Sequence, residues 1–169
     1  MARKYARAAG VALLVIGFLG FLGIAIAAVG GSKWFARDFE WPAAISAGVV
    51  HIDGYYYVPH VSSRVQVYDE EWNFMHSFYV PSDGGVFAIG KGVNETIVVH
   101  TARGNYVLHY ARSGELLKQR QYDYAYMDTG ATVVVPTPWY LWPISHPIGF
   151  WLMAALGLLI DTALDKKRK

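Results

Sequence analysis

The longest uncharged segment of the chain constrains its fold more than any other feature. Residues 8–32 contain no Asp, Glu, Lys or Arg, a run of 25 residues. About 20 apolar residues are enough for a helix to cross the hydrocarbon core of a bilayer. The composition agrees, since 17% of the chain is charged, against about 25% in ordinary soluble domains. The run predicts a transmembrane helix over residues 9–31, preceded by a cytoplasmic tail over residues 1–8.

A secretory signal peptide is the alternative for this segment. Arg3, Lys4 and Arg7 form a basic beginning, and Ala25-Ile-Ala27 has the small residues of a cleavage site. However, the apolar part of a signal peptide spans roughly 7–15 residues, and the run here is longer. We therefore expect the segment to be retained as a membrane anchor.

A second apolar segment lies close to the C-terminus. Proline breaks a helix interior because it removes a hydrogen bond and clashes with the preceding turn, and Pro136, Pro138 and Pro143 delay the start of this helix. Pro147 is tolerated in the first turn, where its missing N–H costs nothing. The sequence therefore predicts a second transmembrane helix over residues 145–164, followed by a cytoplasmic tail over residues 165–169.

The distribution of charge predicts the orientation. Lys and Arg precede the first helix and follow the second, and cytoplasmic flanks carry an excess of these residues. Residues 33–144 hold eight basic and eleven acidic side chains, a net charge of −3. We expect both termini in the cytoplasm of a bacterium and the central region, residues 32–144, on the periplasmic or extracellular side of its inner (plasma) membrane. Topology and anionic lipid explain the basic ends, so no nucleic-acid partner is expected.

Small residues recur along the first helix at intervals of three or four, a spacing that lets helix backbones approach closely in lipid. We predict a helix-packing stripe formed by Gly17, Gly20, Gly23, Ala27 and Gly31. Its partner is the protein's own second helix, another copy of the chain or a different integral membrane subunit.

Tryptophans flank both helices at the ends that face the central region. Amphipathic rings collect at the depth of lipid headgroups. We therefore predict a membrane-interface belt formed by Trp34, Trp41, Trp139, Trp142 and Trp151.

The region between the helices has the pattern of an all-β domain. Short runs rich in β-branched and aromatic residues alternate with turn residues such as Asp53-Gly54 and Ser113-Gly114. Nine strands are predicted, over residues 48–52, 55–58, 64–69, 75–80, 86–89, 96–101, 106–111, 116–122 and 131–135. The chain is thus expected to be a membrane protein in which two transmembrane helices flank a small all-β extracytoplasmic domain.

Two stretches of this domain form a weak repeat. Residues 53–74 align with residues 94–115 at offsets of 41 and 42, which place Val58 over Val99 and Tyr68 over Tyr110. The segments Gly54-Tyr-Tyr-Tyr-Val58, Arg64-Val-Gln-Val-Tyr-Asp69 and Tyr106-Val-Leu-His-Tyr110 resemble NHL-type β-propeller repeats. The resemblance implies two blades and a binding platform more than a catalyst. Since two blades cannot close a ring, we expect either a β-sandwich-like domain or open barrel, or a partial propeller completed by another copy or subunit.

The chain shows no constellation typical of an enzyme. It has no cysteine and no Gly-x-Ser-x-Gly segment, and its glycine-rich stretch lies in the first helix rather than after a strand. The histidines of the central region have no metal-binding spacing, so we expect neither a metal nor a cofactor. His146, beside tryptophans at the start of the second helix, is the one candidate ligand for a haem or chlorophyll metal, and an interfacial residue is the favoured interpretation.

Tyrosines are abundant in the central region. Aromatic side chains anchor protein interfaces, although they also pack in cores and at membrane surfaces. The candidates for a protein interface are Tyr55, Tyr57, Tyr122, Tyr124 and Tyr126.

These features favour a non-catalytic accessory subunit that stabilises a larger inner-membrane complex of respiratory or photosynthetic type. Its partners would be other integral membrane subunits and the lipid bilayer, or further copies of itself in a homo-oligomer. The alternative is a periplasmic ligand-binding or sensor module that signals through a partner.

Overall fold

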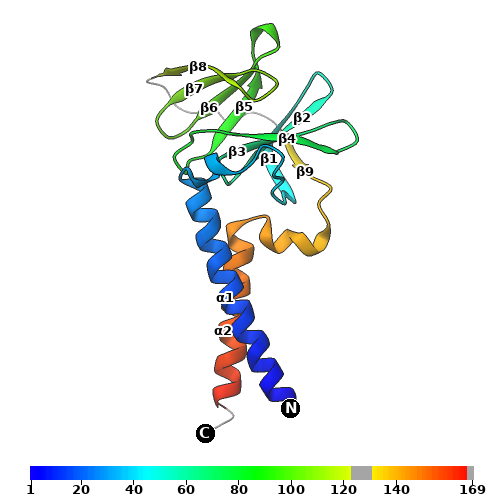
Figure 1. Ribbon diagram of the computed structural model, residues 1–169, viewed down its shortest axis with the longest axis vertical. Coiled ribbons are helices and arrows are strands. Elements are labelled where there is room, and N and C mark those ends of the chain that lie inside the picture. Colours follow the sequence, from blue (N-terminus) through cyan, green and yellow to red (C-terminus); the bar gives the residue numbers. More distant parts are fainter. Residues whose placement is uncertain (123–130, 167–169) are drawn as a thin grey trace.

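The computed structural model describes residues 1–122 and 131–166. Two helices lie side by side and carry a β domain at one end (Figure 1). Helix α1 spans Ala2–Ala28 and helix α2 spans Pro147–Lys166. Both are long and apolar enough to cross a membrane, so the chain is a candidate membrane protein.

The helix boundaries differ from the predicted ones. Helix α1 begins at Ala2 rather than residue 9, because nothing in the basic segment breaks a helix. It ends at Ala28 rather than residue 31, because Gly30 takes the left-handed conformation, with φ of 118°, that commonly ends helices. Gly31 therefore lies in the short helix η1, Gly31–Trp34, and not in α1. Helix α2 begins with Pro147 at its first position.

The β domain contains two antiparallel sheets. Each predicted strand has a counterpart whose ends lie within three residues of the expected ones: β1 Ile45–Ile52, β2 Tyr55–His60, β3 Arg64–Tyr68, β4 Phe74–Tyr79, β5 Phe87–Lys91, β6 Ile97–Thr101, β7 Tyr106–Tyr110, β8 Leu116–Gln121 and β9 Ala131–Val134. The first sheet has the order β4-β3-β2-β1-β9 and the second the order β5-β6-β7-β8. Two further short helices, η2 (Val93–Glu95) and η3 (Trp139–Ile144), lie in connections.

Each sheet contains four consecutive strands joined as a meander. The segments that carry the repeat occupy equivalent places, since residues 55–58 and 64–68 lie in β2 and β3 and residues 97–99 and 106–110 lie in β6 and β7. Strand β9 returns to pair with β1 and leads toward α2. The described residues form two sheets and no further one, and the family resemblance stays a prediction.

The two sheets share one apolar core. Side chains such as Tyr57, Val65 and Val67 from the first sheet meet Val99 and Leu108 from the second. A smaller cluster lies on the opposite face of the first sheet and contains Ala43, Val49, Val58, Tyr68 and Val135. The first sheet is therefore covered on both faces.

Asp53 joins the two sheets at the surface. It lies in the β1–β2 turn, and its carboxylate accepts hydrogen bonds from Lys91 at 2.7 Å and from Arg112. The hydrogen bond from Lys91 is the main reason that the pKa of this carboxyl is lowered. The exposed pair adds little stability, but it ties β5 and the β7–β8 turn to the first sheet.

Candidate functional site at the junction of helices and sheets

Two glycines of the predicted helix-packing stripe lie against α2. A Cβ atom at Gly17 would lie 2.4 Å from the backbone nitrogen of Ala154. A Cβ atom at Gly20 would lie 2.1 Å from the ring of Phe150. Only glycine allows this approach, so the helix that α1 contacts at these two positions is the chain's own second helix.

Gly23 and Gly31 of the stripe do not contact α2 in this way. A Cβ atom at Gly23 would meet nothing within 4 Å among the described atoms. At Gly31 it would meet Ile26 of the same chain segment, because η1 has turned away from the helix axis. Ala27 is buried, with 1% of its surface exposed.

A second close contact between the helices, nearer to the beginning of α1, was not predicted from the sequence. A Cβ atom at Gly157 would lie 2.4 Å from the carbonyl oxygen of Gly10. Gly10 lies seven residues before Gly17, which places both on one face of a helix. This seven-residue spacing could have indicated in the sequence that Gly10 belongs to the same packing face as Gly17.

The end of the helix pair that carries the chain termini is held by ion pairs. The Arg7 guanidinium lies 2.9 Å from the carboxylate of Asp161 and 3.5 Å from that of Asp165. Arg3 donates to the carbonyl of Leu164. Asp161 of α2 thus has a charged partner on α1.

At the opposite end, the segment that follows α1 crosses the outer face of the first sheet. We call residues 32–41 the strap. Arg64, on β3, is 3% exposed and donates to three carbonyls of the strap: Ser32 at 2.6 Å, Phe35 at 3.2 Å and Ala36 at 3.0 Å. One buried guanidinium thus fixes the first half of the strap.

Neighbouring polar side chains hold the second half. The Gln66 amide donates to the carbonyl of Trp41 at 2.9 Å and accepts from its backbone N–H at 2.5 Å. The Tyr68 hydroxyl donates to Glu40 at 3.0 Å, and its pKa is raised by burial first and by the Glu40 charge second. Ser77, on β4, donates to the carbonyl of Phe39 at 3.1 Å. The strap is therefore bonded to β3 and β4 along its length.

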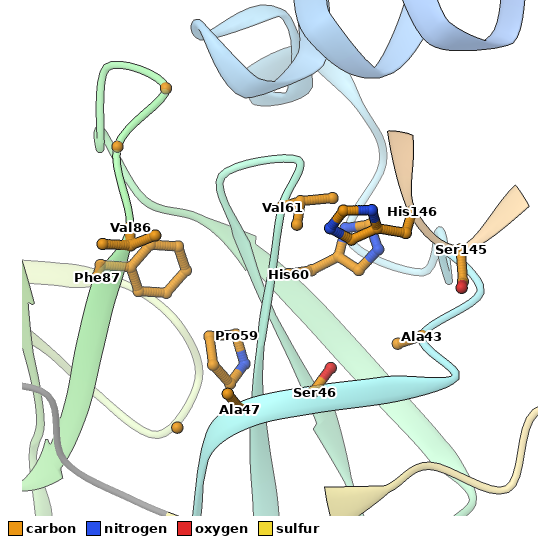
Figure 2. A pocket seen from close by; sticks show the side chains of 13 residues that line it. Ala43, Ser46, Ala47, Pro59, His60, Val61, Val86, Phe87, Ser145 and His146 are labelled. Atoms are coloured by element: carbon orange, nitrogen blue, oxygen red, sulfur yellow. The ribbon is translucent and has the colours of Figure 1, made fainter. Parts of the chain in front are cut away.

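Beside the strap is a cavity of about 470 Å³, a usual size for a small-molecule site. Figure 2 shows side chains from β1, β2, β5 and the two residues before α2 around it. Its lining consists of Ala43, Ser46, Ala47, Gly48, Pro59, His60, Val61, Gly84, Gly85, Val86, Phe87, Ser145 and His146. A Cβ atom at Gly84 would lie 3.2 Å from Val29, so the wall formed by residues 84–87 adjoins the end of α1.

His60 is the buried titratable group of this cavity. It is 5% exposed, and burial lowers its pKa to about 4. The carbonyls of Pro42 and Ser145 oppose that shift, whereas the nearby His146 adds to it. His60 is therefore neutral at physiological pH and lies between the strap and the segment that enters α2.

His146 is exposed and lines the cavity next to His60 (Figure 2). The backbone N–H of Ile148 donates to its Nδ1 at 3.2 Å. A histidine that ligates a metal commonly donates its other ring N–H to an acceptor, and here that nitrogen accepts instead. The hydrogen bond therefore disfavours the haem or chlorophyll ligand considered for His146.

The tryptophans of the predicted belt surround the junction but differ in exposure. Trp34 is 82% exposed and Trp139 is 79% exposed, and Trp142 and Trp151 are also exposed. Trp41 is half-buried: it stacks on Phe35, lies 5.8 Å from the His60 ring and donates to the carbonyl of Ile144 at 3.3 Å. The Trp41 ring therefore packs against other residues of the domain, unlike the four exposed tryptophans.

The tyrosines predicted to form a protein interface do not share one surface. Tyr57 is 1% exposed and belongs to the core, which corrects its assignment to an interface; the alternation of β2 turns its ring inward. Tyr55 and Tyr122 are half-buried. Tyr124 and Tyr126 lie outside the described residues.

Within residues 1–122 and 131–166, no three His, Asp or Glu side chains gather so that they could hold a metal ion. Comparison with protein-family models and with curated proteins finds no match. The function of the chain therefore has to be inferred from its own geometry.

Proposed function

We propose that this chain is a non-catalytic accessory subunit that stabilises a larger bacterial inner-membrane complex, of respiratory or photosynthetic type, through its helices and its periplasmic β domain. The observation that carries the proposal is the strap. Its backbone is bonded to the buried Arg64, Gln66 and Ser77, so the β domain is fixed on α1 rather than tethered by a flexible linker. A subunit that stabilises a complex must hold its contact surfaces in a fixed position relative to its membrane helices.

The outer faces of the helices support this proposal. After α1 and α2 have packed on each other, large apolar side chains such as Phe18, Leu19, Leu152 and Leu159 stay exposed. In a bilayer these faces meet lipid or the helices of neighbouring subunits. The beginning of α1, which carries Arg3 and Arg7, lies beside the end of α2 (Figure 1). Because basic residues begin and end the sequence, this arrangement agrees with two cytoplasmic termini and a periplasmic β domain.

The edge of the second sheet offers a further contact surface. All six residues of β8 are exposed, and β8 pairs with β7 alone among the described strands. An unpaired edge strand is a template on which another chain can add a strand. The resemblance to NHL-type repeats, which implies a binding platform, favours the same role.

The proposal is tested by gentle detergent extraction of the tagged full chain from its native membrane. The extract is separated by size exclusion, and co-eluting proteins are identified by mass spectrometry while the absorption spectrum of the peak is recorded. Co-elution with the subunits of one defined complex is expected, in amounts that Arg64→Met reduces and the exposed control Arg103→Met does not. A chain that elutes without any other protein, as a monomer or homo-oligomer, would overturn the accessory role and favour the ligand-binding alternative.

A further inference from the structure

The accessory role gives no function to the cavity beside the strap. It lies where the ends of both helices meet both sheets, since its lining comes from β1, β2, the segment before β5 and the two residues before α2. Val61 and Val86 on its rim are 40% and 66% exposed. A molecule dissolved in the bilayer would reach this rim by following the surfaces of α1 and α2.

The lining of the cavity selects against charged ligands. None of its thirteen residues is Asp, Glu, Lys or Arg. His60 is held neutral by burial, because its pKa is about 4. An ion placed there would lose hydration without gaining a counter-charge, which is costly. The walls formed by Pro59, Val61, Val86 and Phe87 instead suit an apolar body.

The two histidines determine which polar atom a ligand needs. The backbone N–H of Ser62 donates to Nδ1 of His60 at 3.2 Å, as that of Ile148 does to Nδ1 of His146. When Nδ1 of a neutral imidazole accepts, the ring proton is on Nε2, which then is a donor. Nε2 of His60 is buried and has no hydrogen-bond partner among the described atoms. Of the two rings, the exposed His146 ring provides an N–H donor that a ligand in the cavity can reach, whereas Nε2 of His60 has almost no exposed surface.

We infer that the cavity binds an uncharged, lipid-soluble small molecule that enters from the bilayer and carries a hydrogen-bond-accepting oxygen, such as a carbonyl, which accepts from Nε2 of His146. The apolar body of the ligand packs on Val86 and Phe87. This inference is independent of the accessory role, because binding is measured on the purified chain alone.

The test uses a matched pair of photoreactive probes. Para-pentyl benzophenone is uncharged and carries one carbonyl, whereas the same molecule with a carboxylate at the end of its pentyl chain is an anion. Each is irradiated with the full chain in lipid nanodiscs, and the labelled peptides are mapped by mass spectrometry. The uncharged probe is expected to label residues that line the cavity, and the anion to label them at least fivefold less.

Four variants locate the binding. Val86→Trp fills the rim and should reduce cavity labelling at least fivefold, whereas Val93→Trp, at another exposed valine, in η2 outside the lining, should leave it unchanged. His146→Phe removes a donor at an exposed position and should weaken binding by roughly 2–10-fold, the effect of one hydrogen bond. His146→Gln, which keeps an N–H group, should restore part of that loss.

Labelling confined to the outer faces of α1 and α2, with no response to Val86→Trp, would overturn the inference. Equal cavity labelling by the anion would overturn the assignment of an uncharged ligand. Neither result bears on co-elution with a membrane complex, so failure of the inference and failure of the accessory role are distinguishable.

Discussion

The two connections between the helices and the β domain differ in how they are held. The connection that leaves α1 is the strap, whose carbonyls are bonded to buried Arg64, Gln66 and Ser77. The connection that enters α2, residues 135–146, makes fewer bonds to the domain: Val135 donates to the carbonyl of Ala44 at 3.0 Å, and the carbonyl of Ile144 accepts from Trp41 at 3.3 Å. The first connection sets the position of the domain, whereas the second mainly returns the chain to the helices.

Their aromatic side chains differ in the same way. Phe35, Phe39 and Trp41 of the strap contact one another with ring centroids within 5.9 Å. Trp139 and Tyr140 of η3 contact each other and are otherwise largely exposed. A run of aromatics near a membrane helix can thus be part of a domain or a surface for lipid, and the bonding of its backbone tells which.

The largest expected effect comes from breaking the first connection at Arg64. In Arg64→Met the strap loses the charged donor that three of its carbonyls share, although the carbonyls of Ser32 and Ala36 keep a backbone N–H donor. At about 1–1.5 kcal/mol for each of the three lost hydrogen bonds, the free energy of unfolding should fall by about 3–4 kcal/mol. It is measured by urea titration of the full chain in mild detergent, followed by tryptophan fluorescence. Trypsin should also cleave the variant faster at Lys33 and Arg37 of the strap.

The matched control is Arg103→Met. The Arg103 guanidinium is exposed and donates to one carbonyl, that of Asp83 at 3.0 Å. Its loss should change the free energy of unfolding by less than about 0.5 kcal/mol. Equal effects of the two variants would contradict a structural role for the buried guanidinium.

The next effect is the pH dependence of His60, which lies between the two connections. Its pKa is lowered from 6.5 to about 4 in the folded chain, so the unfolded chain takes up the proton first as the pH falls. The contribution of His60 to the free energy of unfolding is therefore fully present above pH 6.5. It falls as the pH is lowered toward 4, by up to about 3 kcal/mol in all.

His76 and His100 also have pKa values lowered mainly by burial, so they change stability in the same direction. The contribution of His60 is therefore the difference between the wild-type chain and His60→Gln in urea titrations across this range. An identical pH dependence of the two proteins would show that His60 is not buried as a neutral ring.

A smaller effect is expected at the contact between the two helices. Gly17→Leu inserts a side chain where a Cβ atom would lie 2.4 Å from the Ala154 nitrogen, and overpacking of this kind costs about 1–3 kcal/mol. Gly23→Leu, at a position with nothing within 4 Å, is the control. The midpoint of unfolding in dodecyl sulfate should fall for the first variant alone, and a fall for both would assign the stripe to another partner.

The smallest effect is expected in the second connection. Trp139→Ala should change the free energy of unfolding by less than about 0.5 kcal/mol, as surface substitutions do. Trp41→Ala in the strap should cost about 3 kcal/mol, because it removes a large packed ring. Urea titration of both variants compares the connections directly, and the difference disappears if both segments are equally bound to the domain.

The helices and strands could be predicted from the sequence. Which side chains of a strand are buried, and which segment covers them, could not. The helices follow from the length of the apolar runs and the strands from alternation and turn residues. The burial of Tyr57 did not follow, because three successive tyrosines leave open which of them faces the core. The alternation of Arg64 and Gln66 with valines marks one polar face of β3 but does not show that a segment 25–32 residues earlier in the chain covers it.

The candidate site was harder to predict for the same reason. His60 and His146 are 86 positions apart in the printed sequence, and neither has a neighbour at metal-binding spacing. Only the return of β9 to β1, after the second sheet is complete, brings the start of α2 beside β2. Gly17 and Gly20 could be assigned to a packing face by spacing, whereas the identity of their partner helix required the structure.

The most direct test of a β domain fixed on its helices is a distance distribution across the strap. The chain has no cysteine, so Val15→Cys on the outer face of α1 and Val93→Cys in the β domain can be spin-labelled without background. Double electron–electron resonance in lipid nanodiscs should give one narrow distance distribution, which Arg64→Met broadens. A distance distribution that is already broad in the labelled chain with Arg64 intact would contradict a β domain fixed on its helices.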